Sequence, residues 1–154
     1  MQKITIIVGM PGSGKTTYLE THKEEFGNAL ICDDYYRSAT SRPRVSLSCE
    51  GSAYYQDIKE ALALGKDIVI ADILFCKDEY RNEIKEGVKK LVSELKIDAS
   101  MEYRFFENNS TACIANIIRR NRPERVAKEL EFIEEVRGGY KIPEGSVILP
   151  IYKQ

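Results

Sequence analysis

The sequence predicts an α/β fold in which helices flank a mainly parallel, five-stranded sheet. Short apolar runs rich in β-branched residues alternate along the chain with longer segments whose apolar residues recur every three or four positions. A glycine-rich segment, residues 9–16, stands between the first such run and the first helical segment. Strands and helices that alternate in this way are typical of parallel sheets, because each parallel connection needs a crossover helix.

Each element follows from its own pattern, taken in chain order. Glycines mark the ends of helical segments at Gly27, Gly65 and Gly138, and Asn109 or Ser110 can cap a later helix. The expected strands are residues 3–8, 29–32, 67–74, 101–106 and 147–149, and the expected helices are centred on residues 15–26, 54–62, 80–95, 113–118 and 126–136. Residues 36–51 lack periodicity and are expected to form a long, functional loop. No linker or repeat interrupts this order, so residues 1–154 are expected to form one domain.

Composition excludes several classes of protein. The 154 residues are 43% hydrophobic and 31% charged, and no apolar run is long enough for a membrane helix. We see no signal peptide, so we expect a cytoplasmic protein. One histidine and no C-x-x-C pair argue against a zinc site. The net charge of −1 gives no broad positive field for nucleic acid, so any such binding would have to use the local arginines at positions 37, 42 and 44 or 119, 120, 122 and 125.

The glycine-rich segment matches the phosphate-binding motif G-x-x-x-x-G-K-S/T at every fixed position. Its glycines let backbone N–H groups turn inward around phosphates, and the helix that follows adds the partial positive charge of its N-terminus. Lys15 is expected to reach the β- and γ-phosphates of ATP, and the Thr16 hydroxyl to bind Mg²⁺. The residues expected to hold the nucleotide are Gly9, Pro11, Gly12, Ser13, Gly14, Lys15, Thr16 and Thr17.

A P-loop occurs in kinases, GTPases, ATPase motors and passive nucleotide binders. The chain has no N/T-K-x-D segment of the kind that reads guanine in GTPases. Its third strand carries one acid, Asp72, where motor ATPases usually carry an acidic pair. A small chain with an acidic pair after strand two and a late arginine cluster favours a phosphotransferase.

At this level the chain resembles the phage-type polynucleotide 5′-kinases and related small P-loop kinases. The resemblance rests on the P-loop, on the segment Cys32-Asp33-Asp34-Tyr35-Tyr36-Arg37, on Asp72 at the end of the third strand, and on the late arginines from Arg119 to Arg122. It covers most of the chain in order and spacing. It implies a P-loop fold with a short helical lid, Mg-ATP as phosphoryl donor, and a hydroxyl acceptor such as single-stranded nucleic acid or a nucleotide.

Two departures from the family pattern affect the acceptor side. Arg37 follows Asp33 by four positions and Asp34 by three, whereas the family spacing is three, so either aspartate can be the general base; we favour Asp33. Asp72 is followed by apolar residues in place of Thr-Asn, which leaves the native substrate open.

The acceptor side and the lid supply the remaining candidate residues. Asp34, Arg37 and Asp72 are expected to contact the acceptor, with Arg37 holding a phosphate through its fork of donors. Arg119 and Arg122 could share a helix face, since positions three apart are neighbours, but the arginines expected to act in transfer are Arg120 and Arg122.

The leading hypothesis is an ATP-dependent kinase that phosphorylates a hydroxyl, such as the 5′-OH of a polynucleotide or nucleotide. A kinase for a sugar, nucleoside or antibiotic suits the near-neutral charge slightly better. A nucleotide-binding regulatory module without transfer activity is the alternative outside the enzymes.

Overall fold

The computed structural model describes residues 1–33, 47 and 54–153. Its sheet has five strands in the order β2-β3-β1-β4-β5, and every neighbouring pair is parallel, which confirms the predicted sheet and makes it wholly parallel. The strands are β1 (Gln2–Val8), β2 (Ala29–Asp33), β3 (Asp67–Ala71), β4 (Ala99–Phe106) and β5 (Val147–Leu149).

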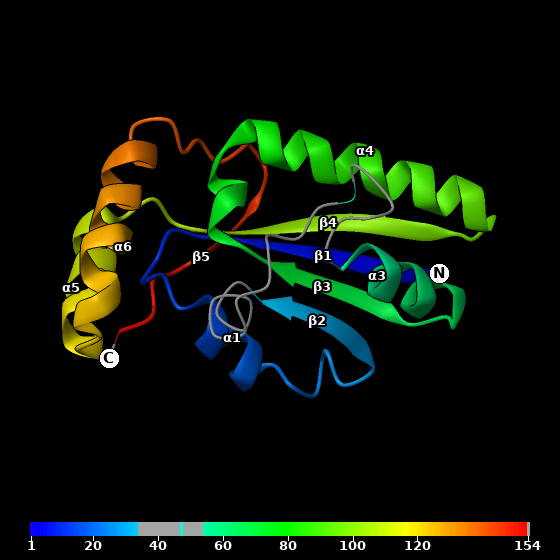
Figure 1. The fold of residues 1–154 in the computed structure, drawn as a ribbon, viewed down its shortest axis with the longest axis horizontal. Coiled ribbons are helices and arrows are strands. Elements are labelled where there is room, and N and C mark those ends of the chain that lie inside the picture. Colours follow the sequence, from blue (N-terminus) through cyan, green and yellow to red (C-terminus); the bar gives the residue numbers. More distant parts are fainter. Residues whose placement is uncertain (34–46, 48–53, 154) are drawn as a thin grey trace.

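The helices pack on both faces of the sheet and at its carboxyl edge. They are α1 (Lys15–Thr21), α3 (Tyr55–Ala63), the 3-10 helix η1 (Ile73–Cys76), α4 (Asp78–Leu95), α5 (Ser110–Arg120) and α6 (Pro123–Val136). Figure 1 shows α1 on one side of the sheet and α4 on the other, with α5 and α6 side by side beyond the ends of the strands. A salt bridge of 3.1 Å from Lys59 to Glu94 joins α3 to α4, so both cover the same face. Among the helices that the structure describes, none combines the length and the apolarity that a membrane crossing requires.

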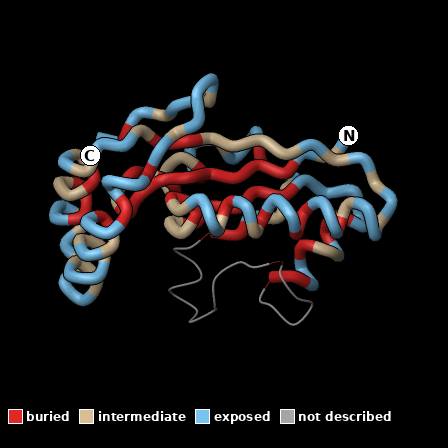
Figure 2. The backbone as a smooth tube through the Cα atoms, turned by 90° about the horizontal axis from the view of Figure 1, so that it is seen from above, coloured by how far each residue is buried: buried red, intermediate tan, exposed pale blue. Residues whose placement is uncertain are grey.

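The core is centred on β1, which lies between β3 and β4. Ile4, Ile6, Ile7 and Val8 are almost fully buried, and the buried segments in Figure 2 follow the strands while the outer faces of the helices are exposed. A parallel strand covered on both faces needs such a continuous apolar run. The β1 strand therefore holds the loop that follows it at the buried centre of the sheet.

Two elements end well before the predicted residue, and polar side chains explain both. Helix α1 ends at Thr21 instead of residue 26, because the Thr21 hydroxyl and the His22 ring nitrogen both lie within hydrogen-bonding distance of the Tyr18 carbonyl (3.1 and 2.8 Å) and compete for it. Strand β3 ends at Ala71 instead of residue 74. The Asp72 carboxylate accepts a hydrogen bond of 2.9 Å from the Leu74 N–H and starts η1 in place of further strand.

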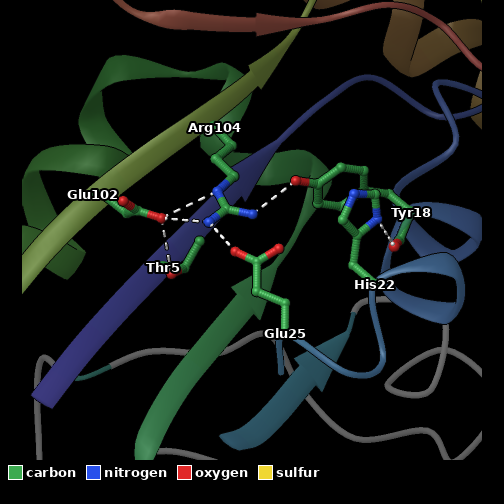
Figure 3. Close-up of polar contacts among 6 residues, drawn as sticks. All are labelled: Thr5, Tyr18, His22, Glu25, Glu102 and Arg104. Atoms are coloured by element: carbon green, nitrogen blue, oxygen red, sulfur yellow. Dashed lines mark hydrogen bonds and ion pairs between the residues drawn. The ribbon is translucent and has the colours of Figure 1, made fainter. Parts of the chain in front are cut away.

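A partly buried arginine connects α1 and the turn after it to the sheet (Figure 3). Arg104 on β4 donates to the Tyr18 hydroxyl (2.7 Å), to the Glu102 carboxylate (2.8 Å) and to Glu25. The hydrogen bond to Glu25 raises the pKa of Arg104 and lowers the pKa of Glu25. Two carboxylates and a phenol satisfy a guanidinium that is only 14% exposed, so this network anchors the helix that starts in the P-loop.

Candidate active site

Three of the predicted site features meet at one edge of the sheet. The strands β2, β3 and β1 are neighbours, with Asp33 paired with Ala71 and Ile7 also paired with Ala71. Because parallel pairing places the carboxyl ends together, Asp33 at the end of β2 and Asp72 after β3 lie beside the P-loop that leaves β1. This edge is where open α/β sheets bind their ligands.

The P-loop has the backbone form that phosphate binding requires. Gly12 and Gly14 have φ angles of +81° and +107°, which other residues rarely adopt, and α1 begins at the next residue. The Lys15 ammonium donates to the carbonyls of Gly9 (3.0 Å) and Met10 (3.3 Å), so the lysine folds back over the loop. Its side chain is buried with the loop, and the helix N-terminus points toward the same place.

Thr16 and Asp33 connect the P-loop directly to the end of β2. The Thr16 hydroxyl donates a hydrogen bond of 3.0 Å to Oδ2 of Asp33, whose side chain is 1% exposed. A carboxylate held this close to the phosphate-binding loop can take up a proton from a hydroxyl at the site. The role of Asp33 as general base stays a prediction, and the structure shows its carboxylate bonded to the P-loop.

The same pair fits a magnesium ion. Because the Thr16 hydroxyl donates its hydrogen bond to Asp33, its oxygen can still act as a metal ligand. Hydroxyl and carboxylate oxygens are the hard ligands that Mg²⁺ prefers, and this ion takes few protein ligands when it is bound with nucleotide phosphates. Within the described ranges no cluster of three or more His, Cys, Asp or Glu side chains could hold a metal ion.

Asp72 lies at the same edge but has a structural contact. Its side chain is 2% exposed and caps η1 through the Leu74 N–H. A carboxylate buried among apolar strands needs such partners, because burying it unpaired would be costly. Its predicted contact with the acceptor stays a prediction.

The arginine cluster lies at the junction of α5 and α6. Arg120 donates to Glu129 on α6 (2.5 Å), and Arg125 lies 3.7 Å from the same carboxylate. The expectation that Arg119 and Arg122 share a helix face is wrong, because α5 ends at Arg120 and Arg122 is the N-cap of α6. The residue between the helices, Asn121, has a φ of +51° and breaks the helical geometry.

Two predicted acceptor residues, Asp34 and Arg37, lie outside the described residues, as do the other arginines of the first basic stretch. The predicted nucleotide residues Pro11 and Thr17 are in place on the loop and in the first turn of α1.

A cavity of about 520 Å³ opens beside the P-loop. Gly14 and Thr17 form its P-loop edge, and Tyr152 closes it from the C-terminal segment. The Tyr18 and His22 rings, which line it together with Phe106, stack with their centroids 3.9 Å apart. Aromatic and apolar linings of this kind are typical of small-molecule sites.

Two residues that support the P-loop have no role in the sequence prediction. Asn116 and Tyr152 contact the loop from outside through hydrogen bonds. The sequence does contain a signal for Asn116, because this polar residue occupies a position between Cys113 and Ile117 on the buried face of α5, where an apolar residue is expected. The sequence contains no such signal for Tyr152, since its contacts are made by its backbone with residues distant in sequence.

Comparison with known proteins identifies the family. A family model described as an AAA domain matches residues 4–140. No curated protein sequence matches the chain. Three solved structures share its fold: a gluconokinase from Sinorhizobium meliloti 1021 (TM-score 0.53, 15% identity, covering 99% of this chain and 84% of that one), the Mycobacterium tuberculosis APS kinase CysC in complex with AMPPNP and APS (0.52, 15%, 99% and 90%), and a fungal RNA kinase (0.55, 15%, 99% and 76%).

These findings confirm the predicted resemblance to small P-loop kinases at the level of the fold. The family model spans most of the chain, including the P-loop, Asp33 and α5. The chain therefore belongs to the family described as an AAA domain and has the α/β fold of the P-loop NTPases.

Proposed function

We propose that the protein is an ATP-dependent kinase that transfers the γ-phosphoryl group of Mg-ATP to a hydroxyl group. The observation that carries this proposal is the 3.0 Å hydrogen bond between Thr16 of the P-loop and the buried carboxylate of Asp33. A module that only binds nucleotide would use this carboxylate beside Thr16 for its metal ion alone, and it needs no carboxylate that takes up a proton. Phosphoryl transfer to a hydroxyl does use one, as the acceptor of the substrate proton.

In the proposed reaction Asp33 takes the proton of the acceptor hydroxyl as its oxygen attacks the γ-phosphorus. A new oxygen–phosphorus bond forms, the bond from the γ-phosphorus to the bridging oxygen breaks, and ADP leaves with that oxygen. Lys15 and the inward N–H groups of the loop bind the phosphate oxygens, and Arg120 and Arg122 balance charge on the moving group. Thr16 would hold Mg²⁺, which supplies charge neutralisation between the β- and γ-phosphates when bound.

We place the base of the nucleotide in the cavity beside Gly14 and Thr17. These residues belong to the start of α1, so a nucleotide whose phosphates occupy the loop reaches this cavity with its sugar and base. The rings along its wall suit a planar base, because stacking accepts any such ring.

For the acceptor we propose the 5′-OH of a polynucleotide or nucleotide, with Asp34, Arg37 and Asp72 as its contacts. The resemblance of the Asp33–Arg37 segment to polynucleotide 5′-kinases supports this choice, and one structure of the same fold is a fungal RNA kinase. A small-metabolite acceptor is the second candidate. It is favoured by the net charge of −1 and by Glu129, which neutralises two arginines of the late basic cluster.

The test is transfer of label from γ-labelled ATP with Mg²⁺ to a panel of 5′-OH DNA and RNA oligonucleotides, nucleosides, sugars and antibiotics. Asp33→Asn keeps an oxygen that accepts from Thr16 but removes the base, so transfer should fall by about 10²- to 10⁴-fold while nucleotide binding persists. Asp67→Asn is the matched control. Asp67 starts the neighbouring strand β3 at its opposite end, where its carboxylate accepts from the Lys3 N–H at 2.8 Å, and its replacement should leave transfer unchanged.

Each outcome selects one hypothesis. Label on an oligonucleotide that disappears in Asp33→Asn supports the polynucleotide acceptor. Label on a small molecule alone keeps the chemistry and replaces the acceptor. A third outcome would refute the kinase proposal in favour of a binding module. In that outcome the wild type binds nucleotide tightly but transfers phosphate to no acceptor, Lys15→Ala loses nucleotide binding, and Asp33→Asn binds nucleotide as the wild type does.

A further inference from the structure

The P-loop is braced from outside by a buried amide and by the C-terminal segment. The Asn116 side chain on α5 is 4% exposed, and its Nδ2 donates two hydrogen bonds, to the Gly12 carbonyl (2.9 Å) and to the Tyr152 carbonyl (2.6 Å). The two acceptors lie 104 and 36 residues away in sequence. One amide group therefore joins a helix, the phosphate-binding loop and the segment after β5.

A third hydrogen bond closes this arrangement. The Tyr152 N–H donates to the Ser13 carbonyl at 3.0 Å, so the C-terminal segment binds the loop through its own backbone as well. Asn116 thus acts on the loop twice, directly at Gly12 and through Tyr152 at Ser13. Two carbonyls of the loop, those of Gly12 and Ser13, therefore accept hydrogen bonds from α5 and from the C-terminal segment.

Holding these carbonyls fixes the N–H groups that share their peptides. The Ser13 N–H, opposite the Gly12 carbonyl, donates to the Met10 carbonyl within the loop at 3.1 Å, and the Gly14 N–H lies opposite the Ser13 carbonyl. In a trans peptide the C=O and N–H groups point in opposite directions, so fixing one fixes the other. The bond from Tyr152 to the Ser13 carbonyl turns the Gly14 N–H to the opposite side, toward the interior of the loop. Amides in the interior are the groups that bind phosphate in a P-loop.

We propose that Asn116 is a positioning residue for nucleotide phosphates, and that it acts by holding the outer carbonyls of the P-loop. This rests on the proposed nucleotide binding, but not on transfer or on the identity of an acceptor. Asn116 lies one turn before Arg119 and Arg120 on α5, so the same contact also links the end of α5 that carries these arginines to the P-loop. Loss of the brace weakens binding of the phosphates without removing any group that touches them.

Asn116→Asp is the sharpest variant, since it keeps the size of the side chain but places a carboxylate against two carbonyl oxygens. Asn116→Ala removes the donor without repulsion and decides the question if the aspartate variant does not fold. Asn108→Asp is the matched control. Asn108 likewise donates to two backbone carbonyls, those of Arg137 (2.8 Å) and Tyr140 (3.1 Å), which lie outside the P-loop.

The experiment measures the dissociation constants of Mg-ADP and Mg-GDP at a temperature where every variant is folded, beside the thermal unfolding midpoint. We expect the Asn116 variants to bind roughly 10- to 100-fold more weakly than the wild type. Asn108→Asp should lower the unfolding midpoint but leave the dissociation constant within about twofold. A residue with a purely structural role would lower the midpoint and leave the affinity of the folded fraction unchanged.

Wild-type affinity in folded Asn116→Asp or Asn116→Ala would overturn the inference and leave the proposed kinase intact. Equal loss of affinity in Asn108→Asp would also overturn it, because the effect would then be general. A wild-type protein that binds neither nucleotide would overturn the proposed function, and the inference with it.

Discussion

A methyl group on Gly12 should destabilise the protein more than the same group on Gly145. Both glycines have a φ of +81°, so alanine meets the same backbone strain at either position. The surroundings differ. A methyl carbon on Gly12 would lie 2.3 Å from the Cys113 carbonyl oxygen and 3.0 Å from Cγ1 of Ile117, whereas one on Gly145 would have nothing within 4 Å.

The magnitudes follow from these distances. Left-handed backbone costs an alanine about 1–2 kcal/mol, and this applies to both variants. At Gly12 the obstructing atom belongs to the backbone of α5, so the helix must move by about 1 Å to restore ordinary contact. Overpacking of this kind costs about 1–3 kcal/mol more. We therefore expect Gly12→Ala to lose about 2–5 kcal/mol and Gly145→Ala about 1–2 kcal/mol.

Urea unfolding followed by circular dichroism measures the difference, since the chain has no tryptophan for fluorescence. Nucleotide affinity should fall only in Gly12→Ala, because the displaced helix carries Asn116 away from the loop. Equal losses of unfolding free energy in the two variants would refute the reasoning. They would mean that strain alone acts and that α5 does not pack against the loop as described.

Three further predictions concern charge and burial. The hydrogen bond from Arg104 lowers the pKa of Glu25, so the stabilisation from that ion pair is present above the ordinary glutamate pKa of about 4.3 and is lost as pH falls below it. In a plot of unfolding free energy against pH, Glu25→Gln should flatten the fall at acidic pH. The same change at the exposed neighbour Glu24 should not. Arg120→Ala should lower kcat at least about tenfold with a smaller change in KM. Arg119→Ala should change neither constant much. Steady-state kinetics of the two variants will show whether Arg120 acts in transfer. Burial raises the pKa of the Cys113 thiol to about 11, so iodoacetamide at pH 8 should modify it only after unfolding, as peptide mass spectrometry can follow; rapid modification of the native protein would contradict its burial.

The sequence predicted the features that depend on local pattern. The P-loop, five strands and the start of α5 at its Asn109 cap, whose side chain accepts from the Ala112 N–H at 3.1 Å, are all confirmed. The two elements that end well before the predicted residue, β3 and α1, are those where a side chain competes with the backbone for hydrogen bonds. Asp72 ended β3 and His22 ended α1, and neither effect changes the apolar periodicity from which the ends were read.

Contacts between distant segments were not predictable from pattern. The strand residue Arg104 gives no sign that it reaches a tyrosine on α1 and a glutamate in the turn after it. Tyr140 likewise donates to the Phe106 carbonyl from a segment with no regular structure, and burial raises its pKa. Such groups depend on the sheet order, which becomes known only when the fold is assembled. The expected shared face of Arg119 and Arg122 failed because α5 ends at Arg120, and the contact of Arg120 with Glu129 of α6 likewise becomes known only from the fold.

The brace also places a requirement on synthesis. Gly12 leaves the ribosome well before the residues that bind the loop from outside. These are Asn116, which donates to the Gly12 carbonyl, and Tyr152, whose N–H donates to the Ser13 carbonyl. At the usual 5–20 residues per second, roughly 7 to 28 seconds separate the appearance of the loop from that of residue 152. During this interval the nascent chain has a phosphate-binding sequence without a phosphate-binding shape. Cellular nucleotide can therefore stabilise the finished domain but cannot help the early chain to fold.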